Sequence, residues 1–343
     1  MDKLDIKSML FEELNDYFAN QGYPKFRAKQ VFDWLHAKQV ESFREMTNLS
    51  HDMIKKLEET CYITTLTIER KLVSNIDETA KYLFKLPDGE LVETVLMKYK
   101  HGNSVCVSTQ VGCKMGCSFC ASTKAGFVRS LTASEILEQI YKAQKDSGER
   151  ISNVVLMGIG EPLDNFLNVV KFLKLISDDR GNNLSLRHLS LSTCGVVDKI
   201  YALAELKLGL TLSISLHAPT NELREQTMPI NKKYKIEELL KACRHYANTT
   251  SRRISFEYAL IKGVNDSKKC ADELATLLRG MLCHVNLIPV NEIKETSFEK
   301  SDRKSIESFA AYLNHKGINT TIRRTLGTDI SAACGQLRRD NIE

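Results

Sequence analysis

The regular alternation of strand-like and helix-like segments beyond residue 104 is the feature that most restricts the fold. Short apolar segments of strand character recur six times, with helical patterns among them and after the last one. The strand candidates are residues 104–109, 151–157, 186–193, 210–217, 254–261 and 284–290. Such alternation predicts parallel strands joined by right-handed crossovers. We therefore expect an α/β fold, a partial (β/α)6 barrel of the TIM type, with its chemistry at the carboxyl ends of the strands.

Two further regions precede this predicted core. Residues 1–62 carry apolar positions at helical spacing, and the period changes to two from about residue 64. Pro87-Asp-Gly89 lies between two alternating segments and predicts a hairpin turn. We expect an N-terminal helical accessory domain over 1–75, a β-hairpin extension over 76–98, the barrel core over 99–331 and a C-terminal tail over 332–343.

Composition restricts the cellular setting more than the activity. The formal net charge of +5 permits an RNA partner without requiring one. Ten cysteines in 343 residues are too few for a disulfide scaffold and indicate metal or redox chemistry in a reducing cytosol. The first residues are rich in charge, and no apolar run approaches the length of a bilayer span. We expect a cytoplasmic protein without membrane contact.

A basic group surrounds the second amphipathic segment of the helical region. It consists of Lys25, Arg27, Lys29 and Lys38. An RNA-contact surface and an ordinary solvated helix face fit it equally well, because charge alone specifies no partner.

The segment Cys113-Lys-Met-Gly-Cys117-Ser-Phe-Cys120 carries three thiols in eight residues. Cys113, Cys117 and Cys120 have C-x3-C-x2-C spacing, and no fourth Cys or His follows closely. A structural zinc site uses four protein ligands, whereas three thiolates in a short loop can hold three corners of a 4Fe-4S cube. The fourth iron would then be open to a substrate or cofactor. A partial zinc site and three ordinary buried cysteines remain alternatives.

Polar residues follow the predicted strands at their carboxyl ends. Gly158-Ile-Gly160-Glu161-Pro162 follows the second strand, Ser192 closes the third, Ser215-Leu216-His217 the fourth and Asn291 the sixth. Each one alone is typical of a turn. Their shared location favours a common binding site, in which glycines permit close backbone approach and Glu161 can accept bonds from an ammonium group.

The other cysteines carry weaker signals. Cys106 lies seven residues before the loop, and Cys334 lies in a tail of small residues. Spacing assigns no partner to the rest, which we interpret as buried or incidental: Cys61, Cys194, Cys243, Cys270 and Cys283.

The cysteine spacing is the hallmark of the radical S-adenosylmethionine (radical SAM) superfamily, in which the open iron chelates SAM. Several longer segments resemble the RlmN family within it. These are Cys106-Val-Ser-Thr-Gln-Val-Gly-Cys113, Cys120-Ala-Ser-Thr-Lys-Ala-Gly-Phe127, Met157-Gly-Ile-Gly-Glu-Pro162, Ser215-Leu-His-Ala-Pro219, Met228-Pro-Ile-Asn231 and Asp329-Ile-Ser-Ala-Ala-Cys-Gly-Gln336. The resemblance runs from the helical N-terminus to the tail.

The resemblance implies a role for each candidate residue. Cys113, Cys117 and Cys120 would bind a 4Fe-4S cluster, Cys334 would carry the methyl group, Cys106 would be the resolving thiol and Glu93 a proton acceptor. The implied SAM contacts are Gly160, Glu161, Ser192, Ser215, Leu216, His217 and Asn291.

The implied reaction is methylation of C2 of an adenine in 23S rRNA and in tRNA, using two SAM molecules. The first SAM methylates Cys334, and cleavage of the second gives a radical that takes hydrogen from this S-methyl group. The resulting methylene radical joins the electron-poor C2, giving a covalent enzyme–RNA adduct. Attack of Cys106 on Cys334 releases methyladenosine and leaves a disulfide, so thiol and one-electron donors such as flavodoxin or ferredoxin are implied. We expect a monomer.

Two alternatives stay open at this stage. Cfr-type enzymes share the catalytic cysteines but methylate C8, and Pro162 and the segment Ala218-Pro-Thr-Asn221 look closer to the C2 branch. An alternative of another class is a non-catalytic, zinc-stabilised RNA-binding protein.

Overall fold

The N-terminal region is built from short helices that pack on one another. The structure is a computed structural model that describes residues 3–100, 102–291 and 296–337; residues 338–343 of the predicted tail lie outside the described residues. The helices are α1 (Phe11–Asn20), α2 (Phe26–Phe32), which continues as a π-helical turn over Asp33–Ala37, and α3 (His51–Thr60). Short parallel strands β1 (Leu4–Asp5) and β2 (Cys61–Tyr62) close the region. Apolar side chains of α1 and α2, such as Leu14, Phe18 and Val31, are fully buried.

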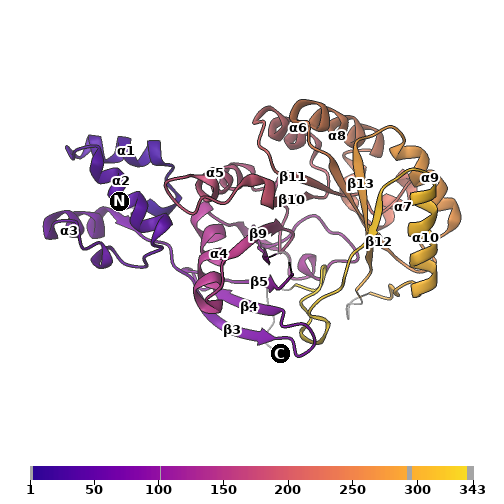
Figure 1. Ribbon diagram of the computed structural model, residues 1–343, viewed down its shortest axis with the longest axis horizontal. Coiled ribbons are helices and arrows are strands. Elements are labelled where there is room, and N and C mark those ends of the chain that lie inside the picture. Colours follow the sequence, from indigo (N-terminus) through magenta and orange to yellow (C-terminus); the bar gives the residue numbers. More distant parts are fainter. Residues whose placement is uncertain (1–2, 101, 292–295, 338–343) are drawn as a thin grey trace.

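The rest of the chain is organised on one open sheet, which contains ten strands among the described residues (Figure 1). One part is antiparallel: β3 (Thr67–Val73), β4 (Ala80–Lys85) and β5 (Leu91–Met97), with β5 pairing β6 (Asn103–Cys106). The turn after Pro87 forms as predicted, since the Gly89 N–H donates to the Leu86 carbonyl. The strand β3 lies within residues 1–75, which we assigned to the helical domain, but it pairs with β4 of the extension. The domain boundaries remain a prediction.

The parallel part continues from β6. Its strands are β9 (Ile151–Leu156), β10 (Leu189–Thr193), β11 (Thr211–Ser215), β12 (Ile254–Leu260), β13 (Cys283–Pro289) and β14 (Thr320–Ile322), each hydrogen-bonded to the next. The helices are α4 (Ala133–Ser147), α5 (Phe166–Ser177), α6 (Val197–Glu205), α7 (Asn221–Thr227), α8 (Ile236–Thr250), α9 (Lys268–Leu278) and α10 (Arg303–His315). The predicted partial (β/α)6 barrel is confirmed, with the helices along its outer side (Figure 1).

Two details differ from the sequence prediction. Residues 186–188 form a 3-10 turn capped by the Ser185 hydroxyl, so the third core strand begins only at Leu189. A further parallel strand, β14, pairs with β13 beyond the six that were predicted. Its three residues are too short to show a period in the sequence.

Helix α4 anchors the N-terminal region to the barrel. The Thr132 hydroxyl caps it by accepting from the Glu135 N–H, and the Glu135 carboxylate accepts from the Thr132 N–H, as the capping-box pattern predicts. The fully buried Lys7 amine donates to Glu138 of α4 at 2.7 Å and to the carbonyl oxygens of Val40 and Thr64. This buried ion pair is satisfied on the lysine side, which fixes how the helical region sits on the core.

None of the described helices combines the length and the apolar character that a membrane span requires.

Candidate active site

A small hairpin closes the base of the cysteine loop. Strands β7 (Gln110–Gly112) and β8 (Phe127–Ser130) pair antiparallel on either side of it. Gly112 has φ +74°, and a Cβ atom there would lie 1.7 Å from the Gly126 carbonyl oxygen, so no other residue fits. At the far side, the Ser118 N–H donates to the carbonyl of Thr227 at the end of α7. The loop is therefore held at both ends.

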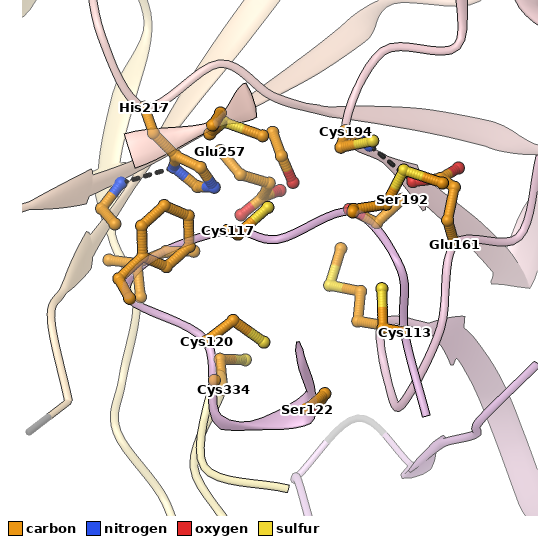
Figure 2. A pocket seen from close by; sticks show the side chains of 18 of the residues that line it. Cys113, Cys117, Cys120, Ser122, Glu161, Ser192, Cys194, His217, Glu257 and Cys334 are labelled. Carbon is orange, nitrogen blue, oxygen red and sulfur yellow. Dashed lines mark hydrogen bonds between the residues drawn. The ribbon is translucent and has the colours of Figure 1, made fainter. Parts of the chain in front are cut away.

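The three loop thiols face one cavity at the carboxyl ends of the parallel strands (Figure 2). Most of the sequence-predicted SAM residues line the same cavity: Gly160, Glu161, Ser192, Ser215, His217 and Asn291. Residues more than 170 positions apart in the sequence are thus brought together, as the strand-end prediction requires.

The donor set fits an iron–sulfur cube better than a single ion. Cys113, Cys117 and Cys120 offer sulfur alone, and burial raises the pKa of each thiol, for Cys113 to about 12. Thiols in such surroundings ionise when a metal binds them. Within residues 3–100, 102–291 and 296–337, no three Cys, His, Asp or Glu side chains surround one metal position. A cube takes one thiolate on each of three irons, so its thiols need not converge on one point.

The glycines after β9 serve the packing of the chain itself. A Cβ atom at Gly158 would lie 2.6 Å from the Val107 carbonyl oxygen, and one at Gly160 would lie 2.5 Å from Cβ of Gln110. Gly160 also has φ +102°. These glycines let the turn lie directly against the segment after β6, and this packing role adds to the close approach of a ligand, which stays a prediction.

Glu161 is buried at the cavity wall, with its carboxylate fixed by backbone donors. Its Oε2 accepts from the Cys194 N–H at 2.8 Å (Figure 2). Its Oε1 accepts from the Leu163 N–H at 3.0 Å. Burial is the largest influence and raises its pKa. Each carboxylate oxygen can accept a further bond, so a ligand ammonium group could be received here.

His217 follows β11 in a left-handed conformation, φ 57°. Its Nδ1 accepts from the Ala259 N–H at 2.9 Å, and its ring meets Phe119 of the cysteine loop edge-on at 4.9 Å. Burial, aided by the nearby Arg224, lowers its pKa to about 3, so the ring is neutral at physiological pH. The preceding Leu216 is buried in the core and is not among the residues that line the cavity.

Cys334 links this cavity to a second one. The tail is docked on the cysteine loop, since the Ala121 N–H donates to the Gly335 carbonyl and the Ser122 hydroxyl to the Leu337 carbonyl. Cys334 lines both cavities, and Cys106 lines the second. Burial, then the proximity of Cys334, raises the pKa of Cys106 to about 12. The two thiols that sequence spacing left unpaired therefore face a shared space.

Glu93 lies outside the lining of both cavities as the described residues form them. It is buried in β5, where its carboxylate pairs with the Lys81 amine at 3.0 Å. Lys81 also donates to the Ser331 carbonyl of the tail at 3.3 Å. The ion pair thus lies beneath the tail, and the proton-acceptor role of Glu93 stays a prediction.

Sequence reasoning missed several residues of the site. Cys194, which we interpreted as buried or incidental, is buried, but it also lines the cavity and holds Glu161 through its N–H. Glu257 and Arg323 also line it, one in the middle of β12 and one just after β14. Arg224 is fully buried and donates to the carbonyls of Cys194, Ser215 and Leu216. Only the position of Cys194, two residues after Ser192 at a strand end, carried a signal in the sequence.

Comparison with known proteins decides the family. Residues 107–274 match the radical SAM superfamily, and residues 4–63 match the ribosomal RNA large subunit methyltransferase N-terminal domain. A probable dual-specificity RNA methyltransferase RlmN of Clostridium novyi is 57% identical over 338 residues, 98% of each chain. The chain belongs to the RlmN family of radical SAM RNA methyltransferases. Its counterpart in Alkaliphilus oremlandii is 54% identical over 343 residues, the full length of both chains.

Solved structures agree with this assignment. A radical SAM methyltransferase from Sphaerobacter thermophilus superposes with a TM-score of 0.94 at 40% identity, covering 98% of this chain and 100% of the other. Streptococcus suis SuiB bound to S-adenosylmethionine shares the fold alone, with a TM-score of 0.50 at 16% identity over 64% of this chain and 50% of the other. The chain is thus an RNA methyltransferase, and its superfamily implies SAM and a 4Fe-4S cluster as cofactors.

Proposed function

We propose that this enzyme methylates C2 of an adenine in 23S rRNA and in tRNA, through a methyl group carried on Cys334. The observation that carries the proposal is the position of Cys334, which lines the cavity of the loop cysteines and also the cavity of Cys106. The relatives named dual-specificity RNA methyltransferases support two RNA substrates. An adenine in either RNA must be unstacked to present C2 to a protein sulfur.

In this proposal, residues that line the first cavity bind the cluster and SAM, together with one buried neighbour. Cys113, Cys117 and Cys120 hold the cluster, and Glu161 receives the ammonium group of SAM. The remaining SAM contacts are Gly160, Ser192, Ser215, His217 and Asn291 in the lining, with Leu216 behind them. When bound, the cluster supplies the electron for reductive cleavage of SAM.

Cys334 and Cys106 have different roles in the transfer of the methyl group. Cys334 Sγ gives up its proton and accepts a methyl group. A radical formed from a second SAM takes one hydrogen atom from this methyl group, and the remaining carbon bonds to C2 of adenine. The C2 proton then leaves together with one electron, which the cluster would accept. Cys106 Sγ attacks Cys334 Sγ, the sulfur–carbon bond breaks, and the released carbon takes up a proton to become the methyl group of the product. The Cys106–Cys334 disulfide that remains needs two electrons before the next turnover.

Glu93 is our candidate acceptor for the C2 proton. Its carboxylate is buried beside the Lys81 amine, under the tail that carries Cys334. This role requires the tail to move so that the ion pair reaches the second cavity.

Flavodoxin or ferredoxin would serve as the one-electron donor, and we propose that the enzyme acts as a cytoplasmic monomer.

Mass spectrometry of methyladenosine isomers tests the proposal. 23S rRNA and tRNA from cells lacking this activity are treated with reconstituted enzyme, SAM and a reductant, and the digested nucleosides are separated. We expect 2-methyladenosine from both RNAs. The C8 isomer alone would contradict the proposal and favour the Cfr-type alternative. Family membership already speaks against a non-catalytic zinc protein.

A further inference from the structure

The turn between β3 and β4, residues 74–79, contacts the tail that carries Cys334 (Figure 1). The Ser74 hydroxyl donates to Asp329 Oδ1 at 2.7 Å, and the Asn75 N–H donates to Asp329 Oδ2 at 3.0 Å. Both oxygens of one carboxylate are therefore bound by the same turn, which lies more than 250 positions away in the sequence.

A second contact binds the tail two residues earlier. Asp77 Oδ2 accepts from the Gly327 N–H at 3.0 Å, while Asp77 Oδ1 accepts from the Thr79 N–H at 3.1 Å. Gly327 has φ +61°, and a Cβ atom there would lie 2.7 Å from Cβ of Ala332 and 3.1 Å from Cγ2 of Thr79. A side chain at position 327 would therefore push the tail away from the turn.

The turn is ordered by its own bonds as well. The Ser74 hydroxyl oxygen accepts from the N–H groups of Ile76 and Asp77 at 3.1 and 3.3 Å, and the Ser74 N–H donates to the Thr79 carbonyl at 2.8 Å. Ser74 itself is buried. The turn thus presents its donors and the Asp77 carboxylate to the tail in a fixed arrangement.

The bend that follows Asp329 in the tail is held from the neighbouring strand. Ser331 has φ 50°, a left-handed conformation that residues other than glycine rarely adopt in a free chain. Its carbonyl accepts from the Lys81 amine of β4 at 3.3 Å. The contacts of the extension with the tail therefore end three residues before Cys334.

Beyond this bend, the tail is bound to the core of the protein. The Asn291 amide donates to the Cys334 carbonyl at 3.0 Å, and the Ala121 N–H of the cysteine loop donates to the Gly335 carbonyl at 2.8 Å. The side chain of Cys334 is exposed. Cys334 thus lies between two anchors of the main chain, one on the extension and one at the cysteine loop.

We propose that Asp329 is a positioning residue, whose bonds to the turn at 74–79 hold the tail so that Cys334 reaches both cavities. The inference rests on the proposed roles of Cys334 and Cys106. Cys334 lines both cavities, and Cys106 lines the second. A tail released from the turn would spread Cys334 over many positions, and the effective concentration of its sulfur at Cys106 would fall.

Hydrogen exchange of the tail tests the contact. Anaerobic holoenzyme without SAM is placed in deuterated buffer, and peptides from residues 327–337 are followed by mass spectrometry. Asp329→Ala removes both bonds to the carboxylate, so we expect the tail amides to exchange about tenfold faster while the rest of the chain exchanges as in the wild type. Asp329→Asn keeps one acceptor oxygen and should give an intermediate rate.

Asp302 offers a matched control. Its Oδ1 accepts from the Ser305 N–H at 2.9 Å and its Oδ2 from the Ser305 hydroxyl at 2.7 Å, so it has the same kinds of donor as Asp329. Asp302→Ala removes a cap of α10 and should leave exchange of the tail unchanged. Unchanged tail exchange in Asp329→Ala would overturn the inference, as would an equal increase in Asp302→Ala or faster exchange throughout the chain.

The stability of the Cys106–Cys334 disulfide separates positioning of Cys334 from simple closure of the tail. Anaerobic holoenzyme is equilibrated with reduced and oxidised glutathione, and the linked peptide is quantified. Formation of the disulfide oxidises the two protein thiols and reduces one glutathione disulfide to two thiols. We expect Asp329→Ala to lower this equilibrium constant about tenfold, which raises the reduction potential of the protein disulfide by about 30 mV. An unchanged constant in a variant whose tail exchanges faster would overturn the positioning role.

Failure of the inference can be distinguished from failure of the proposed function. If 2-methyladenosine does not form while Asp329→Ala still frees the tail and weakens the disulfide, the proposed function fails and the positioning role stands. If the product forms and neither quantity changes, only the inference fails. A wild-type protein in which Cys106 and Cys334 form no disulfide would contradict both.

Discussion

At the scale of single residues, the backbone of the cysteine loop directs its three thiols into the cavity, whereas a cysteine elsewhere in the core does not reach it. The Cys117 carbonyl accepts from the Cys120 N–H and from the Thr123 hydroxyl. These bonds satisfy the main chain inside the loop. The side chains then face the cavity (Figure 2). Cys283, by contrast, begins β13 at the amino end of the strand, away from the cavity.

Replacing Cys117 by Ala should abolish SAM cleavage, because the cube then has only two protein thiolates. Quantification of 5′-deoxyadenosine from anaerobically reconstituted protein checks this. Cys283→Ala removes a thiol that lines neither cavity and should keep wild-type iron content and cleavage. Wild-type cleavage by Cys117→Ala would refute the cluster assignment.

Site residues that belong to a sequence motif or follow a predicted strand could be found from the sequence. The three loop cysteines and the strand-end residues share positions that the strand pattern could predict. Glu257 and Arg323 could not be found this way, because one lies inside a strand and the other follows an edge strand of three residues. They line one cavity only after β12 and β14 take their places on either side of β13.

At the scale of elements, most strands and helices of the core could be predicted because they have a period and a clear end; β14 is the exception. Thr132, for example, marks the start of α4 in the sequence and caps it in the structure. The strand β3 was less clear: most of its residues are exposed, so it shows no apolar alternation. The packing of the helical region on α4 could not be predicted either. Lys7 and Glu138 form a buried ion pair, but in a sequence such residues are typical of the surface.

This packing should make the N-terminal region sensitive to acid through His36. The ring is fully buried in the π-helical turn, against Phe32 and near the Tyr141 hydroxyl. Burial, then the charge of Lys7, lowers its pKa from 6.5 to about 3. The unfolded chain takes up this proton below about pH 6.5 while the folded protein does not. Stability is therefore fully present above that pH and falls as the pH drops from about 6.5 toward 3.

Replacing His36 by Gln should remove this part of the pH dependence. Between about pH 7 and pH 5, the wild type should lose about 2 kcal/mol more unfolding free energy than His36→Gln. Urea titrations followed by fluorescence report on this region, since Trp34 is the only tryptophan. The raised pKa of Glu138 acts in the opposite direction but is common to both proteins. Equal pH dependence in the two proteins would show that His36 does not couple folding to protonation.

At the scale of the whole molecule, the helical region and helices α9 and α10 lie at opposite ends, with the parallel strands between (Figure 1). An RNA that reaches the cavity can therefore contact the N-terminal helices without touching α9. Lys25 and Lys29 are exposed on this region, whereas Arg27 is tied to the Asn48 carbonyl at 2.9 Å. The two lysines are the better test of RNA contact, because Arg27 also has a structural bond.

Reversing Lys25 and Lys29 to Glu should weaken RNA binding and flatten its salt dependence. Each lysine that neutralises a phosphate adds about 0.7–0.9 to the slope of log affinity against log salt, so its reversal should lower the slope by that amount. SAM cleavage without RNA should be unaffected. The matched control reverses Lys268 and Lys269, two exposed lysines on α9. If both double variants bind alike, the basic group is solvated surface.

The most direct test of the central claim is the intact mass of the Cys106→Ala protein purified from cells. Cys334 can still be methylated and can still bond to adenine, but no thiol then breaks the sulfur–carbon bond. We predict RNA joined covalently to Cys334, stable to denaturation and trimmed by nuclease to one modified nucleotide. The Cys106→Ala, Cys334→Ala double variant should carry none. A Cys106→Ala protein with free, unmodified Cys334 and no attached RNA would contradict the assignment of these two cysteines.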